Sequence, residues 1–216
     1  MVVEAVQAEA GIYTPQNNFL QALRQRCTDT GTLLILDEVQ TGYGRTGTLF
    51  AMEQHQLVPD ILCIAKGMGG GMPIGAFIAS NEVMAHLKDN PILGHISTFG
   101  GHPVSCAAAL ATLKTLQESQ LIESVKAKEA LFLKHLTHSA IKEVRSAGLM
   151  IAVELESFEF LQAVIDQCLQ RGIIVDWFLF NDRSMRIAPP LIITEEEIST
   201  ACSRINEAID AALSAT

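Results

Sequence analysis

Short apolar runs and amphipathic segments alternate along the first half of the chain. Runs that predict buried strands lie at residues 2–6, 33–36, 61–65 and 74–79, since a strand covered on both faces shows no polar alternation. Thr14 and Pro15 are suited to begin a helix that Gly31 ends, and Pro103 to begin a second, alanine-rich helix. This alternation predicts an α/β fold with a mostly parallel sheet and flanking helices.

From about residue 117 the pattern becomes more polar and its helices more amphipathic. Helices are predicted at 121–138 and 158–170, and a last one begins at the capping box formed by Thr194 and Glu197. Strands are predicted near 141–145, 149–154, 173–175 and 184–188. The change of pattern predicts a separate small α+β domain, so we divide the chain into domains at 1–118 and 119–216.

Two of the apolar runs end in a charged residue. Asp37 follows the run at 33–36, and Lys66 follows the run at 61–65, with a glycine-rich stretch directly after the lysine. Because ligands bind at the carboxyl ends of strands in open α/β sheets, we expect both side chains at one edge of the sheet. A lysine that forms an imine and an aspartate that keeps a pyridine nitrogen protonated are the pair that pyridoxal phosphate requires. Either residue alone would more often be a solvated lysine or a helix-capping aspartate.

Several motifs, in order along nearly the whole chain, resemble the class III (fold-type I) pyridoxal-phosphate aminotransferases, especially their acetylornithine, ornithine and 4-aminobutyrate branch. The matching segments lie at residues 6–11, 36–42, 44–47, 59–61, 65–67, 97–101 and 185–191. The resemblance implies that residues 1–118 are the later part of the large cofactor-binding domain and that 119–216 are the small C-terminal domain. It also implies that Lys66 is the catalytic residue and forms a Schiff base with the cofactor.

The resemblance implies roles for the residues around the cofactor. Asp37 would bind the pyridine nitrogen, Val39 would pack on the ring and Gln40 would reach its phenolic oxygen. Glu38, between them, is expected to serve mainly local structure. Thr98 would contact the cofactor phosphate of a neighbouring subunit, which implies a homodimer, although a Ser-Thr turn is the ordinary interpretation of that segment.

Three further residues are implied at the substrate end. Arg186 would bind the substrate α-carboxylate through its planar guanidinium, Glu9 would pair with that arginine, and Ser97 would lie beside Thr98. Such a switch lets one site accept an ω-amino donor first and the acceptor 2-oxoglutarate second, in a ping-pong transamination. The alternatives are a non-catalytic fragment that keeps the fold, and a decarboxylase or aminomutase reaction on the same fold.

The composition argues against a nucleic-acid-binding, membrane-spanning, disulfide-linked or zinc-binding protein. The 216 residues are 49% hydrophobic and carry a formal net charge of −9, which does not suit a nucleic-acid-binding surface. No apolar run approaches the roughly 20 residues that cross a membrane. Five scattered cysteines without a CxxC pair favour reduced thiols, and the histidines lack zinc-ligand spacing. We therefore expect a cytoplasmic protein with no metal site.

A competing motif lies at residues 42–47, which fit the pattern G-x-G-x-x-G. A dinucleotide-binding turn joins a strand directly to a helix and is followed by an acidic residue about 20 positions later. Here residues 38–41 separate the strand from the motif. About 20 positions after the motif, near residue 67, the chain has glycines in place of the required acidic residue. The pattern therefore disfavours a dinucleotide site.

The length adds one expectation. Class III aminotransferases are roughly twice as long as this chain, and their phosphate loop and ring-covering aromatic residue precede the segments matched here. The chain thus resembles the C-terminal half of such an enzyme. We expect it to form a homodimer or to associate with an N-terminal half.

Overall fold

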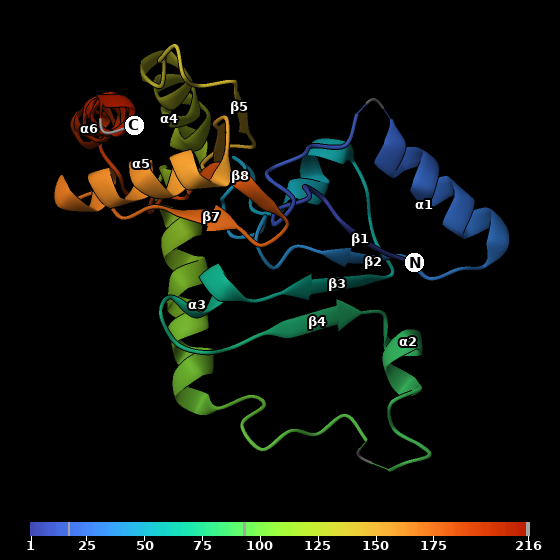
Figure 1. The fold of residues 1–216 in the computed structure, drawn as a ribbon. Helices are drawn as coiled ribbons and strands as arrows, with labels where there is room; N and C mark the ends of the chain where they lie inside the picture. The colour runs from blue at the N-terminus through green and yellow to red at the C-terminus, as the bar shows by residue number, and fades with distance from the viewer. Residues whose placement is uncertain (17, 93, 215–216) are drawn as a thin grey trace. The chain divides into compact units, whose positions relative to one another are not determined.

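The computed structural model describes residues 1–16, 18–92 and 94–214 (Figure 1). These residues form two compact units. The first comprises residues 1–5, 15–44 and 48–120, and the second comprises 6–14, 45–47 and 121–216. The units differ from the domains proposed from the sequence in a boundary two residues later, after residue 120, and in two short segments, 6–14 and 45–47, which belong with the C-terminal residues. The apolar side chains Val6, Ala8 and Ile12 explain the first exchange, because they are buried in a cluster with Met150 and Phe178.

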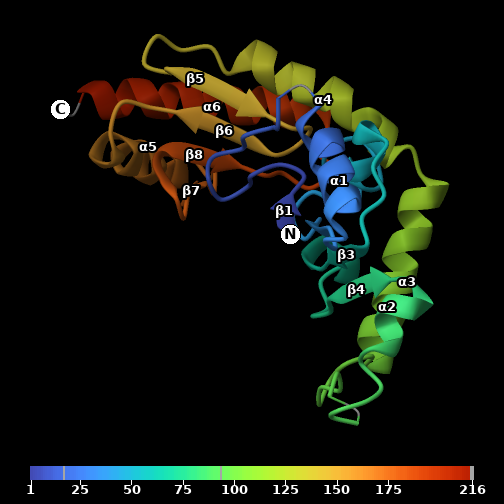
Figure 2. The same cartoon turned by 90° about the vertical axis from the view of Figure 1, so that its right-hand side faces the viewer.

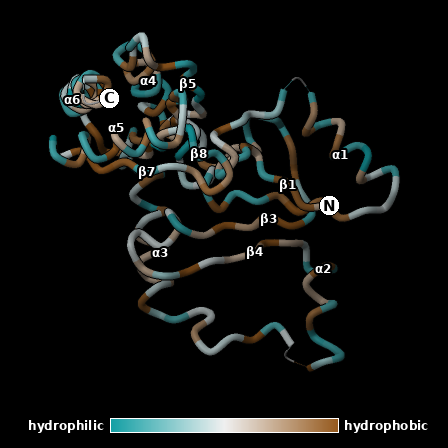
Figure 3. The backbone as a smooth tube through the Cα atoms, in the orientation of Figure 1, coloured by the Kyte–Doolittle hydropathy of each residue, from teal (hydrophilic) through white to brown (hydrophobic). Residues whose placement is uncertain are grey.

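A four-stranded sheet organises the first unit, in the order β1-β2-β3-β4. Its strands are β1 (Val2–Glu4), β2 (Ile35–Asp37), β3 (Ile61–Ile64) and β4 (Ala76–Ala79). The pairs β1–β2 and β2–β3 are parallel and β3–β4 is antiparallel, so the predicted mostly parallel sheet is confirmed. Figure 3 shows the hydrophobic stretch along β3.

Helices and two 3-10 turns complete the first unit. They are α1 (Phe19–Thr30), η1 (Ala51–His55), η2 (Lys66–Gly69), α2 (Asn81–Ala85) and α3 (Pro103–Glu118). Gly31 ends α1 in the left-handed conformation, as predicted. The predicted helix start at Thr14 was wrong. Residues 14–16 have no regular structure after the isolated antiparallel bridge between Tyr13 and Gln7, and α1 begins at Phe19 with Asn18 as its N-cap.

The second unit contains an antiparallel sheet in the order β5-β6-β8-β7. Its strands are β5 (Glu143–Ser146), β6 (Ile151–Glu154), β7 (Asp176–Phe178) and β8 (Asn181–Ile187). Its helices are α4 (Leu121–His135), α5 (Phe158–Gln170) and α6 (Glu195–Ser214) (Figure 2). The strand predicted at 173–175 was wrong, because the residues that pair with β8 are 176–178.

Both faces of this second sheet are covered. Ile151 and Val153 on β6 pack with Met185 of β8 and with side chains from the three helices. Ala152, between them on β6, faces the other way and is buried with residues of the 6–14 segment, as the period-2 alternation of a strand requires. In the same sheet, Arg186 of β8 is paired with Ala152 of β6 on one side and with Asp176 of β7 on the other.

Candidate functional site

The first group of predicted site residues lies at one edge of the parallel sheet. Asp37 is the last residue of β2, and Lys66 follows the neighbouring parallel strand β3 after a single intervening residue. Asp37 is paired in register with Cys63, so the carboxyl ends of both strands reach the same edge. Burial raises the pKa of the Cys63 thiol, and the neighbouring Asp37 carboxylate adds to that rise.

The Asp37 carboxylate also organises the turn that follows it. Its Oδ1 accepts a hydrogen bond of 2.9 Å from the backbone N–H of Val39, an Asx-type contact that stabilises a turn after a strand. Asp37, Val39 and Gln40 are all partly buried. The carboxylate is therefore oriented by the backbone while part of it remains accessible to a ligand.

Lys66 occupies an unusual backbone conformation. Its φ of 46° lies in the left-handed region, which costs a non-glycine residue energy and persists only where surrounding structure enforces it. Enforcement comes from η2, which packs against α3. At Gly70, a Cβ atom would lie 2.1 Å from Oγ1 of Thr112 on α3, so only glycine permits this approach. The side chain of Lys66 itself is exposed.

Glu38 is committed to local structure, as the sequence suggested. Its side chain is buried, and its oxygens accept hydrogen bonds from the backbone N–H groups of Ala51 (2.9 Å) and Met52 (2.7 Å) and from Thr41 Oγ1 (2.5 Å). It thus satisfies free amides at the start of η1. These contacts give Glu38 a structural role next to Asp37 in the sequence.

Ser97 and Thr98 lie in the loop between α2 and α3. Both residues are exposed, and the backbone carbonyl of Ser97 accepts a 3.4 Å hydrogen bond from Gly100 N–H. The loop is part of the same unit as Asp37 and Lys66. Both residues are therefore accessible to solvent.

The second group of predicted residues meets on the antiparallel sheet of the other unit. Arg186 on β8 forms an ion pair with Glu9, with 3.2 Å between Nη1 and Oε1. The other Glu9 oxygen, Oε2, accepts a 3.2 Å bond from Leu179 N–H, and the Glu9 carbonyl accepts one of 3.0 Å from Phe180 N–H. Glu9 therefore links the arginine to the turn between β7 and β8.

A third member of this group, Asp176, was not predicted from the sequence. Its carboxylate accepts hydrogen bonds from Nε (2.8 Å) and Nη2 (2.5 Å) of Arg186. Hydrogen bonding to Asp176 is the main reason that the pKa of Arg186 is raised, against the lowering effect of burial. The sequence signal that could have found it is the ten-residue separation of Asp176 and Arg186, which suits partners across a hairpin. The strand predicted at 173–175 left Asp176 outside that pairing.

The glycine-rich segment at 42–47 has a structural role. Arg45 is partly buried, its pKa is lowered by burial, and its guanidinium donates to the carbonyls of Pro189 (2.5 Å) and Leu149 (3.3 Å). The Arg45 carbonyl accepts a 3.0 Å bond from Leu149 N–H, and a Cβ at Gly148 would lie 2.4 Å from that oxygen. No helix begins at this segment, so it does not have the form of a dinucleotide-binding turn.

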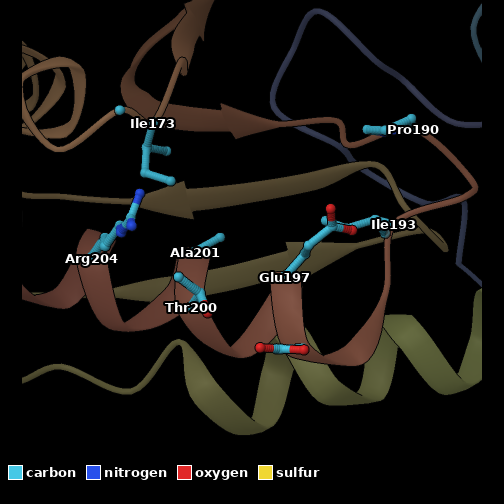
Figure 4. A pocket seen from close by; sticks show the side chains of 9 residues that line it. Ile173, Pro190, Ile193, Glu197, Thr200, Ala201 and Arg204 are labelled. Atoms are coloured by element: carbon cyan, nitrogen blue, oxygen red, sulfur yellow. The ribbon is translucent and has the colours of Figure 1, made fainter.

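A depression of about 500 Å³ in the second unit contains none of the predicted site residues. Figure 4 shows Thr200, Ala201 and Arg204 projecting from α6 into it. The remaining labelled side chains are those of Ile173, Pro190, Ile193 and Glu197. Two of its charged residues have structural contacts, since Arg204 donates to the Arg171 carbonyl (3.0 Å) and Glu197 caps α6 through Thr194.

Metal-binding clusters and membrane-spanning helices are both absent from the described part of the chain. Among residues 1–16, 18–92 and 94–214, no three His, Cys, Asp or Glu side chains are grouped to hold a metal ion. No helix within those ranges has the length and apolar character needed to cross a membrane.

Comparison with known proteins gives a consistent result. Residues 1–209 match the profile of the class III aminotransferases. Over 212 residues the chain is 44% identical to a putrescine aminotransferase of Pectobacterium atrosepticum, covering 95% of this chain and 44% of that protein. The chain therefore spans less than half the length of this relative.

Solved structures agree with the sequence match. An ornithine aminotransferase from Toxoplasma gondii, described with partial occupancy of pyridoxal phosphate at its active site, superposes with a TM-score of 0.89 at 34% identity, covering 99% of this chain and 51% of that one. An (S)-enantioselective ω-transaminase from Thermomicrobium roseum gives a TM-score of 0.86 at 35% identity, covering 99% and 50%.

Proposed function

The chain belongs to the class III aminotransferase family, and from that premise we propose that it provides the lysine, aspartate and arginine of a transaminase active site. The observation that carries the proposal is the pairing of strand ends. Asp37 ends β2 and Lys66 follows the adjacent parallel strand β3 at the same sheet edge, where α/β proteins bind ligands.

Pyridoxal phosphate is the cofactor that membership of this family implies, and the chemistry of the donor set fits it. Asp37 offers a partly buried, backbone-oriented carboxylate that suits a protonated pyridine nitrogen. Lys66 offers a primary amine that suits the aldehyde. When bound, the cofactor supplies a ring that withdraws electrons from the substrate carbon bearing the nitrogen.

The side chains of this chain then have distinct tasks. Asp37 would accept a hydrogen bond from a protonated ring nitrogen. Val39 would pack on the ring and Gln40 would bind its phenolic oxygen, while Glu38 between them is tied to the start of η1. The Lys66 amine would take the proton from the substrate carbon and return it, as a general base and acid.

At the substrate end, we assign carboxylate binding to Arg186. A guanidinium can bind a carboxylate through two parallel hydrogen bonds. Its 3.2 Å contact with Glu9 supports a switch in which Glu9 covers the arginine for an ω-amino donor and leaves it for 2-oxoglutarate. Donors of the acetylornithine, ornithine, 4-aminobutyrate or putrescine type fit this scheme.

Partners and location belong to the same proposal. The exposed position of Ser97 and Thr98 supports contact with a cofactor phosphate across a homodimer. Because the chain spans about half of its relatives, we also propose association with an N-terminal half that carries the remaining phosphate ligands. Its five free cysteines fit the reducing cytoplasm.

The test is chemical mapping of the cofactor. Borohydride treatment of the assembled holoenzyme should fix the cofactor to Lys66, identified by mass spectrometry of the peptide, and Lys66→Ala should abolish the adduct. Lys88 offers a matched control in the same unit, since Lys88→Ala should leave labelling unchanged. An adduct at any other lysine contradicts the assignment, and a stable fold that takes up no cofactor supports the alternative of a non-catalytic fragment.

A further inference from the structure

Arg186 is held by two carboxylates that approach it from different sides. Asp176 takes the edge of the guanidinium formed by Nε and Nη2, at 2.8 and 2.5 Å. Glu9 takes Nη1 alone, at 3.2 Å. The two-point contact is the shorter one, and geometry of this kind is the stronger form of an arginine–carboxylate pair.

The two carboxylates also differ in how firmly the fold holds them. Asp176 and Arg186 are direct cross-strand neighbours in the β7–β8 pair, so the sheet itself sets their separation. Glu9 lies in a turn, held by bonds from the Leu179 and Phe180 N–H groups, and meets Arg186 through a single 3.2 Å contact. Because Asp176 has two shorter contacts to the same arginine, a ligand that displaces one partner of Arg186 displaces Glu9 more readily than Asp176.

The charges of the cluster oppose an incoming carboxylate. One guanidinium and two carboxylates give the cluster a formal charge of −1, and Asp176 still neutralises the arginine after Glu9 has moved away. A substrate carboxylate arriving at Arg186 is thus repelled by Asp176. Side-chain exposures of 33% for Arg186 and 50% for Asp176 mean that solvent screens the effect to a modest size.

We propose that Asp176 stays paired with Arg186 after Glu9 has left it and hinders the binding of a substrate carboxylate there; we call this contact the lock. Asp176 is thus a positioning residue that biases the enzyme toward amine donors with no carboxylate on the reacting carbon. The inference rests on the proposed function, in which Arg186 reads that carboxylate. Diamines and ω-amino acids belong to the favoured class of donor, and α-amino acids belong to the disfavoured class.

A matched pair of donors tests the lock in the assembled holoenzyme. Glutamate and 4-aminobutyrate share one carbon chain and differ by the carboxylate on the amine-bearing carbon. In Asp176→Asn, the ratio of kcat/KM for 4-aminobutyrate to that for glutamate should fall about fivefold. Asp182→Asn, an exposed carboxylate on β8, should leave the ratio unchanged. An unchanged or increased ratio in Asp176→Asn overturns the proposal.

A binding measurement separates the lock from turnover. Glutarate, an unreactive dicarboxylate, should bind Asp176→Asn about threefold to fivefold more tightly than the unmodified protein in calorimetry, with the difference shrinking as salt is added. A residue that only oriented Arg186 would give weaker binding when replaced, and that result also overturns the proposal. Asp176→Ser provides the same comparison if the asparagine variant does not fold. Tighter glutarate binding without any transamination would keep the lock and refute the proposed function.

Discussion

At the scale of single residues, the two predicted groups differ in what a sequence can show about them. Asp37 ends one apolar strand and Lys66 follows another, so the strand pattern and the family resemblance together singled out both residues as candidates. Asp176 gains its importance only from its register opposite Arg186. That register depends on where the two strands of the hairpin begin, and the strand predicted at 173–175 left Asp176 outside the pairing.

Arg186 gives the prediction that belongs to this scale. Arg186→Lys removes the planar fork that holds a carboxylate by two bonds, so the half-reaction with 2-oxoglutarate should lose about tenfold in kcat/KM. The half-reaction with an ω-amino donor should lose much less, because Arg186 is then covered by Glu9. Stopped-flow absorbance of each half-reaction measures both losses. Arg183→Lys, at an exposed position on the same strand, is the control, and equal losses in both halves would make Arg186 structural.

At the scale of elements, helices with strong local signals and the apolar strands of the first sheet were predicted close to their observed positions, whereas β7 was not. The helix predicted at 158–170 is α5 with the same bounds, where Ser157 caps its first turn by accepting from Phe160 N–H. The capping box of Thr194 and Glu197 likewise begins α6. In contrast, β7 lies three residues beyond the run at 173–175, because pairing with β8 decides which residues form the strand.

The turn after Lys66 gives a prediction about element packing. In Gly70→Ala, the new Cβ would meet Thr112 Oγ1 at 2.1 Å and the residue would keep φ near +55°. Thr112 can rotate away only by breaking its 2.9 Å bond to the Ala108 carbonyl. We expect a loss of about 2 kcal/mol in the free energy of unfolding, measured by urea denaturation, and weaker cofactor uptake because η2 carries Lys66.

A comparison with Gly31→Ala isolates the clash. Gly31 has a similar φ of 65°, but a Cβ added there would meet nothing within 4 Å, so its replacement measures backbone strain alone. Adding Thr112→Ala to Gly70→Ala should recover the remaining part of the loss. Equal destabilisation by the two glycine variants would show that the contact between η2 and α3 does not constrain the turn.

At the scale of the whole molecule, the first sheet has two open edges within the described residues. β1 and β4 are its terminal strands, and Ile78 on β4 is 52% exposed. Unpaired strand edges and exposed apolar side chains favour association with another chain. The relatives that this chain matches are about twice as long, so a complementary N-terminal half is the partner that we expect to cover these edges.

The last prediction is that the 216-residue chain alone binds pyridoxal phosphate weakly and does not transaminate. Asp37 and Lys66 supply contacts to the ring and the aldehyde, but a cofactor phosphate draws much of its binding energy from several amides and hydroxyls held together. Thr98, exposed in its loop, offers a single hydroxyl. Cofactor affinity by fluorescence titration and transaminase activity should both rise by at least about a hundredfold when an N-terminal half is co-expressed, with Lys66→Ala in the assembled protein as the inactive control. Full activity of the isolated chain would show that Asp37, Lys66 and the residues around them form a sufficient site without a partner.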